Sequence, residues 1–136
     1  MRILIVGKDE TRFSVLAAAL QRQQETRIVC AATGIAGLAT LKGKQVDLAI
    51  VDEKLDDMSG IDFVKLLVKA YPLVNTAIVS TLTTEEFHEA TDGLGVLLQL
   101  PREPRQKDAA TLLGILEKIG VLLQPMARPR QKVGQS

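Results

Sequence analysis

Short apolar runs alternate along this chain with segments of helical periodicity, and this alternation restricts its fold more than any other feature. The runs are rich in β-branched residues, which is typical of strands buried on both faces of a sheet. In the first helical segment, apolar residues recur at three- and four-residue spacing, as in Phe13, Leu16 and Leu20. The pattern predicts five strands: Ile3 to Val6, Arg27 to Ala32, Val46 to Asp52, Thr76 to Thr81 and Val96 to Leu100.

Residues that start helices stand at the expected points between these runs. Thr33, Ser59 and Thr83 can each accept a hydrogen bond from the first turn of a following helix. Glu86 comes three residues after Thr83 and completes a capping-box pattern there. A fifth helix is predicted from about Asp108 to Leu123, so that every strand is followed by a helix.

This alternation predicts one α/β domain with a parallel sheet covered by helices on both faces and joined by right-handed crossovers. In sheets of this kind the functional site lies outside the carboxyl ends of the strands. We therefore expect it among the residues that follow the strands: Gly7 to Asp9, Asp52 to Lys54, Ser80 to Leu82, and Leu100 to Pro101.

The composition is that of one globular domain. The 136 residues include 17 basic and 16 acidic side chains, and 46% are hydrophobic. No apolar run approaches the ~18 residues needed to span a bilayer, and so balanced a charge provides no basic surface for nucleic acid. We therefore expect a soluble, cytoplasmic domain with neither a membrane nor a nucleic-acid partner.

The charge of the C-terminal segment 125–136 differs from that of the rest. Arg128, Arg130 and Lys132 lie in this segment, whereas all 16 acidic residues precede it. We therefore divide the chain into a globular domain of residues 1–124 and a flexible basic tail or truncated linker of residues 125–136.

The single cysteine, Cys30, excludes an intramolecular disulfide and any multi-cysteine metal cluster. Because it lies on a predicted strand, we interpret it as a small buried apolar residue.

The residues at the predicted strand ends resemble those of a known family. Asp52 closes the third strand, Met58-Ser59-Gly60 starts the next helix, and Ser80 follows the core of the fourth strand. In this order they resemble the receiver domain of two-component response regulators, over nearly all of residues 1 to 123. The resemblance implies a doubly wound (βα)5, flavodoxin-like fold with strand order 2-1-3-4-5. Further matching segments are Ala32 to Leu38, Asp92-Gly93-Leu94-Gly95 and Pro101.

The resemblance also assigns roles to individual residues. Asp52 falls on the phosphoaccepting aspartate, and Ser80 falls on the Ser/Thr switch residue. Gly7 and Lys8 stand where the family has two acidic residues that hold Mg²⁺. Asp9 lies one residue too late for that role and is expected to cap the first helix.

The last strand departs from the family as well. Leu100 replaces the lysine that contacts the phosphoryl group, and Leu97 replaces an aromatic residue. We interpret Asp56, Asp57 and His88 as solvated side chains. The residues expected in the pocket around Asp52 are Gly7, Lys8, Asp9, Leu100 and Pro101.

These departures bear on phosphorylation. Phosphoryl transfer to a carboxylate brings negative charges together, and the metal and the lysine offset that repulsion. With Gly7 and Lys8 in place of the ligands, we expect weak or no Mg²⁺ binding and no other cofactor. Asp52 is then either a phosphoacceptor or an acid paired with Lys8 or Lys54, and Lys8 either reaches Asp52 or points into solvent.

We interpret the chain as an atypical receiver that acts by protein–protein interaction, with a fully phosphate-independent pseudo-receiver as the alternative. The resemblance implies a sensor histidine kinase or another signalling protein as partner. The apolar residues of the last helix and of the strand Val96 to Leu100 further predict a homodimer or partner complex. In that helix one stripe should face the sheet (Leu112, Leu116, Ile119, Leu123), whereas other apolar residues fall outside it (Leu113, Ile115, Val121).

Two other function classes fit less well. A flavodoxin-like electron carrier needs a glycine- and hydroxyl-rich phosphate loop after the first strand, where this chain has Gly7-Lys8-Asp9-Glu10. Aromatic residues make up only 3% of the chain, and tryptophan is absent. A small enzyme would need a catalytic motif, and neither a nucleophile elbow nor a glycine-rich nucleotide loop is present. We therefore predict a non-enzymatic signalling domain.

Overall fold

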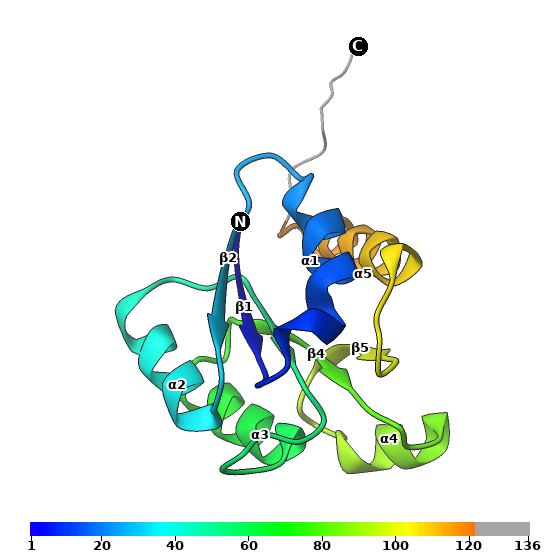
Figure 1. The fold of residues 1–136 in the computed structure, drawn as a ribbon. Helices are drawn as coiled ribbons and strands as arrows, with labels where there is room; N and C mark the ends of the chain where they lie inside the picture. The colour runs from blue at the N-terminus through cyan, green and yellow to red at the C-terminus, as the bar shows by residue number, and fades with distance from the viewer. Residues whose placement is uncertain (122–136) are drawn as a thin grey trace.

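Five parallel strands form one sheet in the order β2-β1-β3-β4-β5 (Figure 1). The structure is a computed structural model that describes residues 1–121; the predicted tail 125–136 lies outside the described residues. The strand order confirms the predicted doubly wound (βα)5 arrangement. The strands are β1 (Arg2–Val6), β2 (Arg27–Ala31), β3 (Leu48–Val51), β4 (Asn75–Val79) and β5 (Val96–Leu100).

The helices begin where the capping residues predict. Thr33 accepts from the backbone N of Ala36 at 3.1 Å, and Ser59 accepts from that of Asp62 at 3.0 Å. Thr83 forms the predicted capping box. None of the described helices is both long enough and apolar enough to cross a bilayer. The helices are η1 (Glu10–Phe13, a 3-10 turn), α1 (Ser14–Gln21), α2 (Gly34–Gly43), α3 (Gly60–Ala70), α4 (Thr84–Ala90) and α5 (Gln106–Lys118).

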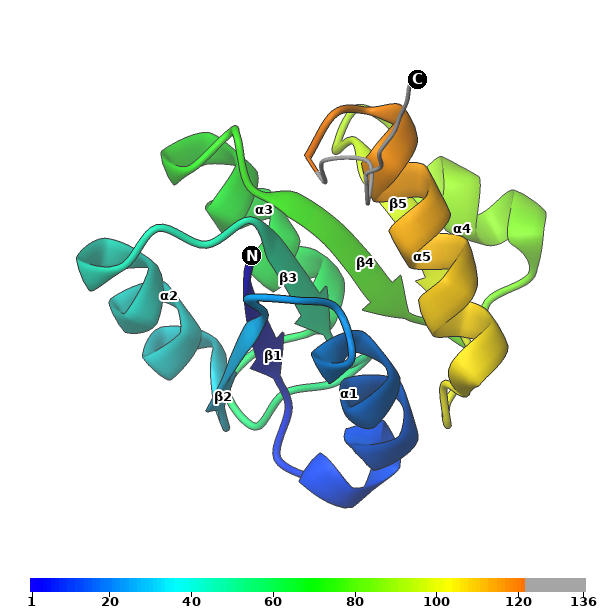
Figure 2. The same cartoon turned by 90° about the horizontal axis from the view of Figure 1, so that it is seen from above.

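Alternation along the strands divides the core into two layers. On β1, Ile3 and Ile5 face one layer, whereas Leu4 and Val6 face the other. The first layer is packed by α1 and α5, and the second by α2, α3 and α4 (Figure 2). Both faces of the sheet are therefore buried, and the loops at the carboxyl ends of the strands remain open to carry a site.

The last helix is shorter than predicted. It ends at Lys118, because Gly120 has φ +83° and turns the chain in a conformation that favours glycine. Ile119, which was expected to face the sheet, is 50% exposed, so that prediction was wrong. Leu113 and Val121 were expected outside the buried stripe, yet they pack partly against the core. The apolar surface of α5 is therefore smaller than the sequence suggests.

Cys30 corrects a second prediction. It was expected to be buried, but its side chain is exposed because β2 is an edge strand. Burial of part of the thiol and the nearby negative charge of Glu10 raise the pKa of Cys30, since both disfavour the thiolate.

Gly60, the first residue of α3, permits a close approach of two backbone segments. A Cβ at this position would lie 2.1 Å from the carbonyl oxygen of Asp52. Its backbone N–H donates to the carbonyl of Glu53 at 2.9 Å. The absence of a side chain at Gly60 therefore fixes the start of α3 against the end of β3.

Two glycine substitutions are expected to change stability in opposite directions. Gly60→Ala should lower the free energy of unfolding by about 1–3 kcal/mol, because the backbone at Asp52 must move. Gly114→Ala should raise it by up to about 1 kcal/mol, because that helical position has open space around it. Urea denaturation monitored by circular dichroism measures both changes. A neutral Gly60→Ala would contradict the role assigned to this glycine.

Candidate functional site

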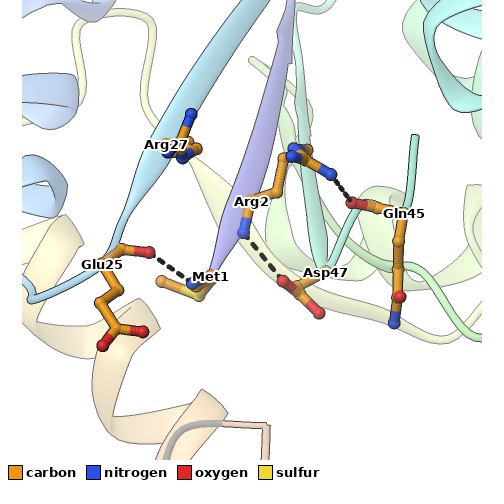
Figure 3. A pocket seen from close by; sticks show the side chains of 6 residues that line it. All are labelled: Met1, Arg2, Glu25, Arg27, Gln45 and Asp47. Carbon is orange, nitrogen blue, oxygen red and sulfur yellow. Dashed lines mark hydrogen bonds between the residues drawn. The ribbon is translucent and has the colours of Figure 1, made fainter. Parts of the chain in front are cut away.

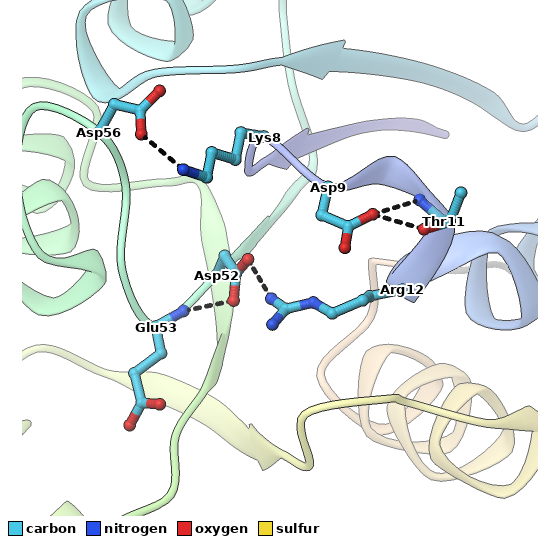
Figure 4. A network of polar contacts seen from close by, with 7 residues as sticks. All are labelled: Lys8, Asp9, Thr11, Arg12, Asp52, Glu53 and Asp56. Atoms are coloured by element: carbon cyan, nitrogen blue, oxygen red, sulfur yellow. Dashed lines mark hydrogen bonds and ion pairs between the residues drawn. The ribbon is translucent and has the colours of Figure 1, made fainter.

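A cleft of about 870 Å³ lies at the carboxyl ends of the strands, where the loops after β1, β3, β4 and β5 meet. Four of the predicted site residues line it: Lys8, Asp9, Asp52 and Ser80. Glu53, which falls within the expected range Asp52 to Lys54, lines it as well, and so do Arg12 and Arg102, which lie outside the expected ranges. The polar contacts of the cleft are drawn in Figure 4.

A second hollow, of about 580 Å³, lies at the opposite end of the sheet (Figure 3). There the backbone N of Arg2 donates to the carboxylate of Asp47 at 2.8 Å, and the Arg2 side chain donates to the carbonyl of Gln45 at 3.1 Å. These contacts join the amino ends of the strands and involve none of the predicted site residues.

Asp52 directly follows β3 and is only 6% exposed. Its backbone N–H donates to the carbonyl of Val6 at 2.9 Å, which places it beside the end of β1. One carboxylate oxygen, Oδ1, accepts from the backbone N of Glu53 at 2.8 Å. The other, Oδ2, forms an ion pair with Arg12. Both carboxylate oxygens therefore have partners within the chain.

Arg12 reaches Asp52 from the short turn η1. Its guanidinium donates through Nη2, its side chain is 19% exposed, and its Cζ lies 5.8 Å from the centroid of the Phe13 ring. Among the described residues, Nε of Arg12 is buried without a hydrogen-bond partner. The Arg12 guanidinium stabilises the buried carboxylate of Asp52, because burial of an unpaired charge is costly.

Lys8 does not pair with Asp52. Its side chain is 68% exposed, in agreement with the alternative that it points into solvent, and its Nζ lies 3.2 Å from Oδ1 of Asp56, whose side chain is 56% exposed. The two lysine partners offered for Asp52 were therefore wrong, because its ion pair is with Arg12. Figure 4 shows Lys8 and Arg12 approaching the loop after β3 from different directions.

Asp9 caps η1, as predicted. Its carboxylate accepts from the backbone N of Thr11 at 3.2 Å and from the Thr11 hydroxyl. The hydroxyl bond, with help from the backbone donor, lowers the pKa of Asp9 by stabilising the charged form. This carboxylate therefore shapes the turn that carries Arg12.

Asp57 was interpreted as a solvated turn residue, but it links the β3–α3 loop to α2. Its two oxygens accept from the backbone N–H groups of Gly34 and Ile35 at 2.8 and 2.9 Å. These donors lower the pKa of Asp57 because they favour the carboxylate. The stabilisation is present above the pKa of the carboxyl in the unfolded chain, and it is lost as the pH falls through the lower folded pKa.

Ser80 follows β4 and is 7% exposed. Its hydroxyl accepts from the backbone N of Leu82 at 3.1 Å. The next residue, Thr81, donates its backbone N–H and its hydroxyl to the carboxylate of Glu53, at 2.7 and 2.9 Å. The loop after β4 is thus bonded to the residue that follows Asp52.

The other predicted pocket residues lie around the cleft rather than in it. Gly7 packs its backbone against Asp52, and a Cβ there would lie 3.1 Å from the Cβ of Asp52. Leu100 is fully buried in the layer under α1 and α5. Pro101 is exposed, and neither Leu100 nor Pro101 lines the cleft.

The resemblance implies a Mg²⁺ site at Asp52, and the residues present do not fit one. Mg²⁺ needs oxygen ligands, usually one or two carboxylates together with waters. Arg12 occupies one oxygen of Asp52, Asp9 is bonded to Thr11, and Lys8 is a further cation beside the cleft. Among residues 1–121, no three acidic, histidine or cysteine side chains are grouped to hold a metal ion.

Sequence reasoning missed Arg12, and it missed the hydrogen-bond partners of Glu53 and Asp57. Arg12 had a detectable signal, because the first turn of the first helix lies at the carboxyl end of the sheet and faces the predicted site. Glu53 and Asp57 gave a weaker signal, since an acid in a loop is usually solvated. His88 is exposed, as predicted.

Comparison with known proteins gives the following similarities. The model of the response regulator receiver domain matches residues 3–104. A solved receiver domain protein (CheY-like) from Methanospirillum hungatei JF-1 is 26% identical, with 87% of this chain and 92% of that chain covered and a TM-score of 0.71. No curated protein matches the sequence significantly.

Two further solved structures share the fold at lower identity. The chemotaxis response regulator CheY4 of Vibrio cholerae is 22% identical, with 87% of this chain and 97% of that chain covered and a TM-score of 0.70. A two-component response regulator from Legionella pneumophila is 20% identical, with 87% and 98% covered and a TM-score of 0.71.

The two ion pairs of the cleft are expected to differ in their contribution to stability. Arg12→Ala should lower the free energy of unfolding by about 2–3 kcal/mol, because it leaves the Asp52 carboxylate buried without a cation. Lys8→Ala should cost about 0.5 kcal/mol or less, because its pair is exposed. Urea denaturation measures both values. Adding Asp52→Ala to Arg12→Ala should cost little more, and fully additive losses would contradict the pairing.

Proposed function

The chain belongs to the family of response regulator receiver domains, and on that basis we propose that it is an atypical receiver that signals by protein–protein interaction. In this proposal Asp52 is not an efficient phosphoacceptor. The domain is not an enzyme in its own right, and its place is in the cytoplasm with the signalling proteins that it contacts. The alternative is a pseudo-receiver whose signalling does not depend on phosphate at all.

The ion pair between Arg12 and Asp52 carries this proposal. A carboxylate that attacks a phosphoryl group needs a free oxygen and positive charge placed around the incoming phosphate. Here Oδ2 of Asp52 is bound to Arg12 and Oδ1 is bound to the backbone of Glu53. Transfer would require the guanidinium to leave, and Gly7 and Lys8, which stand where the family has its acidic metal ligands, supply no carboxylate to hold a metal in its place.

The proposed partners are a sensor histidine kinase or another signalling protein, and a second copy of this chain. Receiver domains are signalling modules that interact with such proteins. The surface of β5 and α5 supports self-association to a limited extent, because Leu97, Leu98 and Leu113 are only half-buried there. Ile119 at the end of α5 adds an exposed apolar side chain.

Incubation with acetyl phosphate and Mg²⁺, followed by intact mass measurement, tests the central claim. The wild-type chain should remain unmodified. The double variant Arg12→Ala, Lys8→Asp should gain the mass of one phosphoryl group, because it frees Asp52 and supplies a second carboxylate. Lys8 is preferred to Gly7 for the new acid, since a side chain at Gly7 would crowd the Oδ2 of Asp52 at 3.3 Å.

The matched control is Asp52→Asn in each background, which should abolish any modification. A phosphoryl increment on the wild-type chain that disappears in Asp52→Asn would show efficient phosphorylation and would contradict the proposal.

Self-association is tested by sedimentation at several concentrations. Ile119→Glu should weaken any dimer by placing a charge in its apolar contact. Leu73→Glu is the matched control, because Leu73 is 92% exposed and lies between α3 and β4, away from β5 and α5. A wild-type monomer at every concentration would remove the homodimer from the proposal and leave the heterologous partner.

A further inference from the structure

Glu53 connects two loops that come from neighbouring strands. Its chain position is directly after Asp52, and its carboxylate Oε2 accepts from both the backbone N and the hydroxyl of Thr81, at 2.7 and 2.9 Å. Figure 4 shows the Glu53 carboxylate directed away from Lys8 and Arg12. It therefore serves the β4–α4 loop, residues 80–83, rather than either cation.

Three further polar groups of the β4–α4 loop are bonded to β5. Gln99 of β5 donates through Nε2 to the carbonyls of Ser80 and Leu82, at 3.2 and 2.8 Å. The backbone N of Ser80 donates to the carbonyl of Leu100 at 3.1 Å. Gln99 thus binds two carbonyls of the loop and Leu100 binds one of its N–H groups, whereas Glu53 supplies the anion for the Thr81 donors.

The anion is well placed to control the loop. A carboxylate that accepts from a backbone N–H and a hydroxyl makes stronger hydrogen bonds than a neutral acceptor. Thr81 lies two residues before Thr83, which caps α4 with Glu86. Fixing Thr81 therefore fixes the start of α4, and with it the face that α4 presents.

We propose that Glu53 is a built-in anion that holds the β4–α4 loop and the start of α4 in one conformation, in place of a phosphoryl group on Asp52. The inference rests on the proposed function, in which Asp52 is not efficiently phosphorylated, because Glu53 then fixes the loop in the absence of a phosphoryl group. Any anion arriving at Asp52 would have to displace Glu53 before it could engage the Thr81 donors. The contact thus opposes a conformational change of the loop driven by phosphate. It keeps the loop in the same conformation for a binding partner.

Amide hydrogen exchange of the β4–α4 loop, resolved by NMR on the whole chain, tests this inference. Glu53→Ala should accelerate exchange at Thr81 about fivefold or more, the effect expected when a capping acceptor is removed from a backbone N–H. Glu53→Gln keeps the length and one neutral acceptor, so it should accelerate exchange by a smaller factor. The Thr81 amide proton should also move upfield in both variants.

A charge control separates an anion at Glu53 from a general effect of the cleft. Asp56→Asn removes a carboxylate of the same loop that pairs with Lys8. This variant should leave exchange at Thr81 unchanged. Thr81→Val keeps the backbone donor and removes the hydroxyl, so it should give a partial increase, and it replaces Glu53→Ala if that variant does not fold.

The inference is overturned if Glu53→Ala leaves exchange at Thr81 unchanged, if Glu53→Gln matches the wild type, or if Asp56→Asn loosens the loop as much as Glu53→Gln does. None of these results depends on the phosphorylation assay. A wild-type chain that accepts phosphate would defeat the proposed function alone, whereas an unaltered loop in the Glu53 variants would defeat this inference alone.

Discussion

A carboxylate buried at the end of a central strand must be neutralised, and the arrangement of the cleft follows from how this chain does so at Asp52. Asp52 is 6% exposed and borders the apolar ends of β1 and β3. Leaving it unpaired would cost several kcal/mol, or would drive it to the neutral form. The cation comes from Arg12, and Arg12 can reach it only because η1 turns the chain between β1 and α1. Asp9 caps that turn, so one acid in the loop positions the cation that another acid requires.

The other acids around the cleft also have partners within the chain. Asp56 pairs with Lys8, Asp57 binds the first turn of α2, and Glu53 binds Thr81. These carboxylates are therefore bonded to groups of the chain and are not arranged around a metal ion. A magnesium site needs acidic oxygens that converge on one point, whereas here each carboxylate is directed at a different element of the chain.

The fold could be predicted from the sequence because it depends on patterns that many residues share. Alternation of apolar runs and helices gave the parallel sheet, and Thr33, Ser59 and Thr83 gave the helix starts. The site depended on single side chains, which periodicity does not place. Lys8 has the right charge and a suitable chain position to pair with Asp52, yet the cation is Arg12, which lies further along the chain in η1. Cys30 was expected to be buried because only the apolar pattern of its strand was considered, although the expected strand order already placed β2 at an edge.

The position of Leu100 explains why these changes leave the fold intact. A leucine there joins the layer under α1 and α5, where it is fully buried. Arg12, which belongs to η1, brings a positive charge to Asp52, whereas β5 ends in the uncharged Leu100. The carboxylate of Asp52 is bonded to Arg12 of η1 and to the backbone N–H of Glu53, and the carboxylate of Glu53 in turn binds Thr81 of the β4–α4 loop. Asp52 is therefore connected to that loop through Glu53, and the hydrogen bonds of its own carboxylate go to Arg12 and Glu53 rather than to Ser80 or Thr81. The proposed atypical function rests on this arrangement, because both carboxylate oxygens of Asp52 are already bonded within the chain.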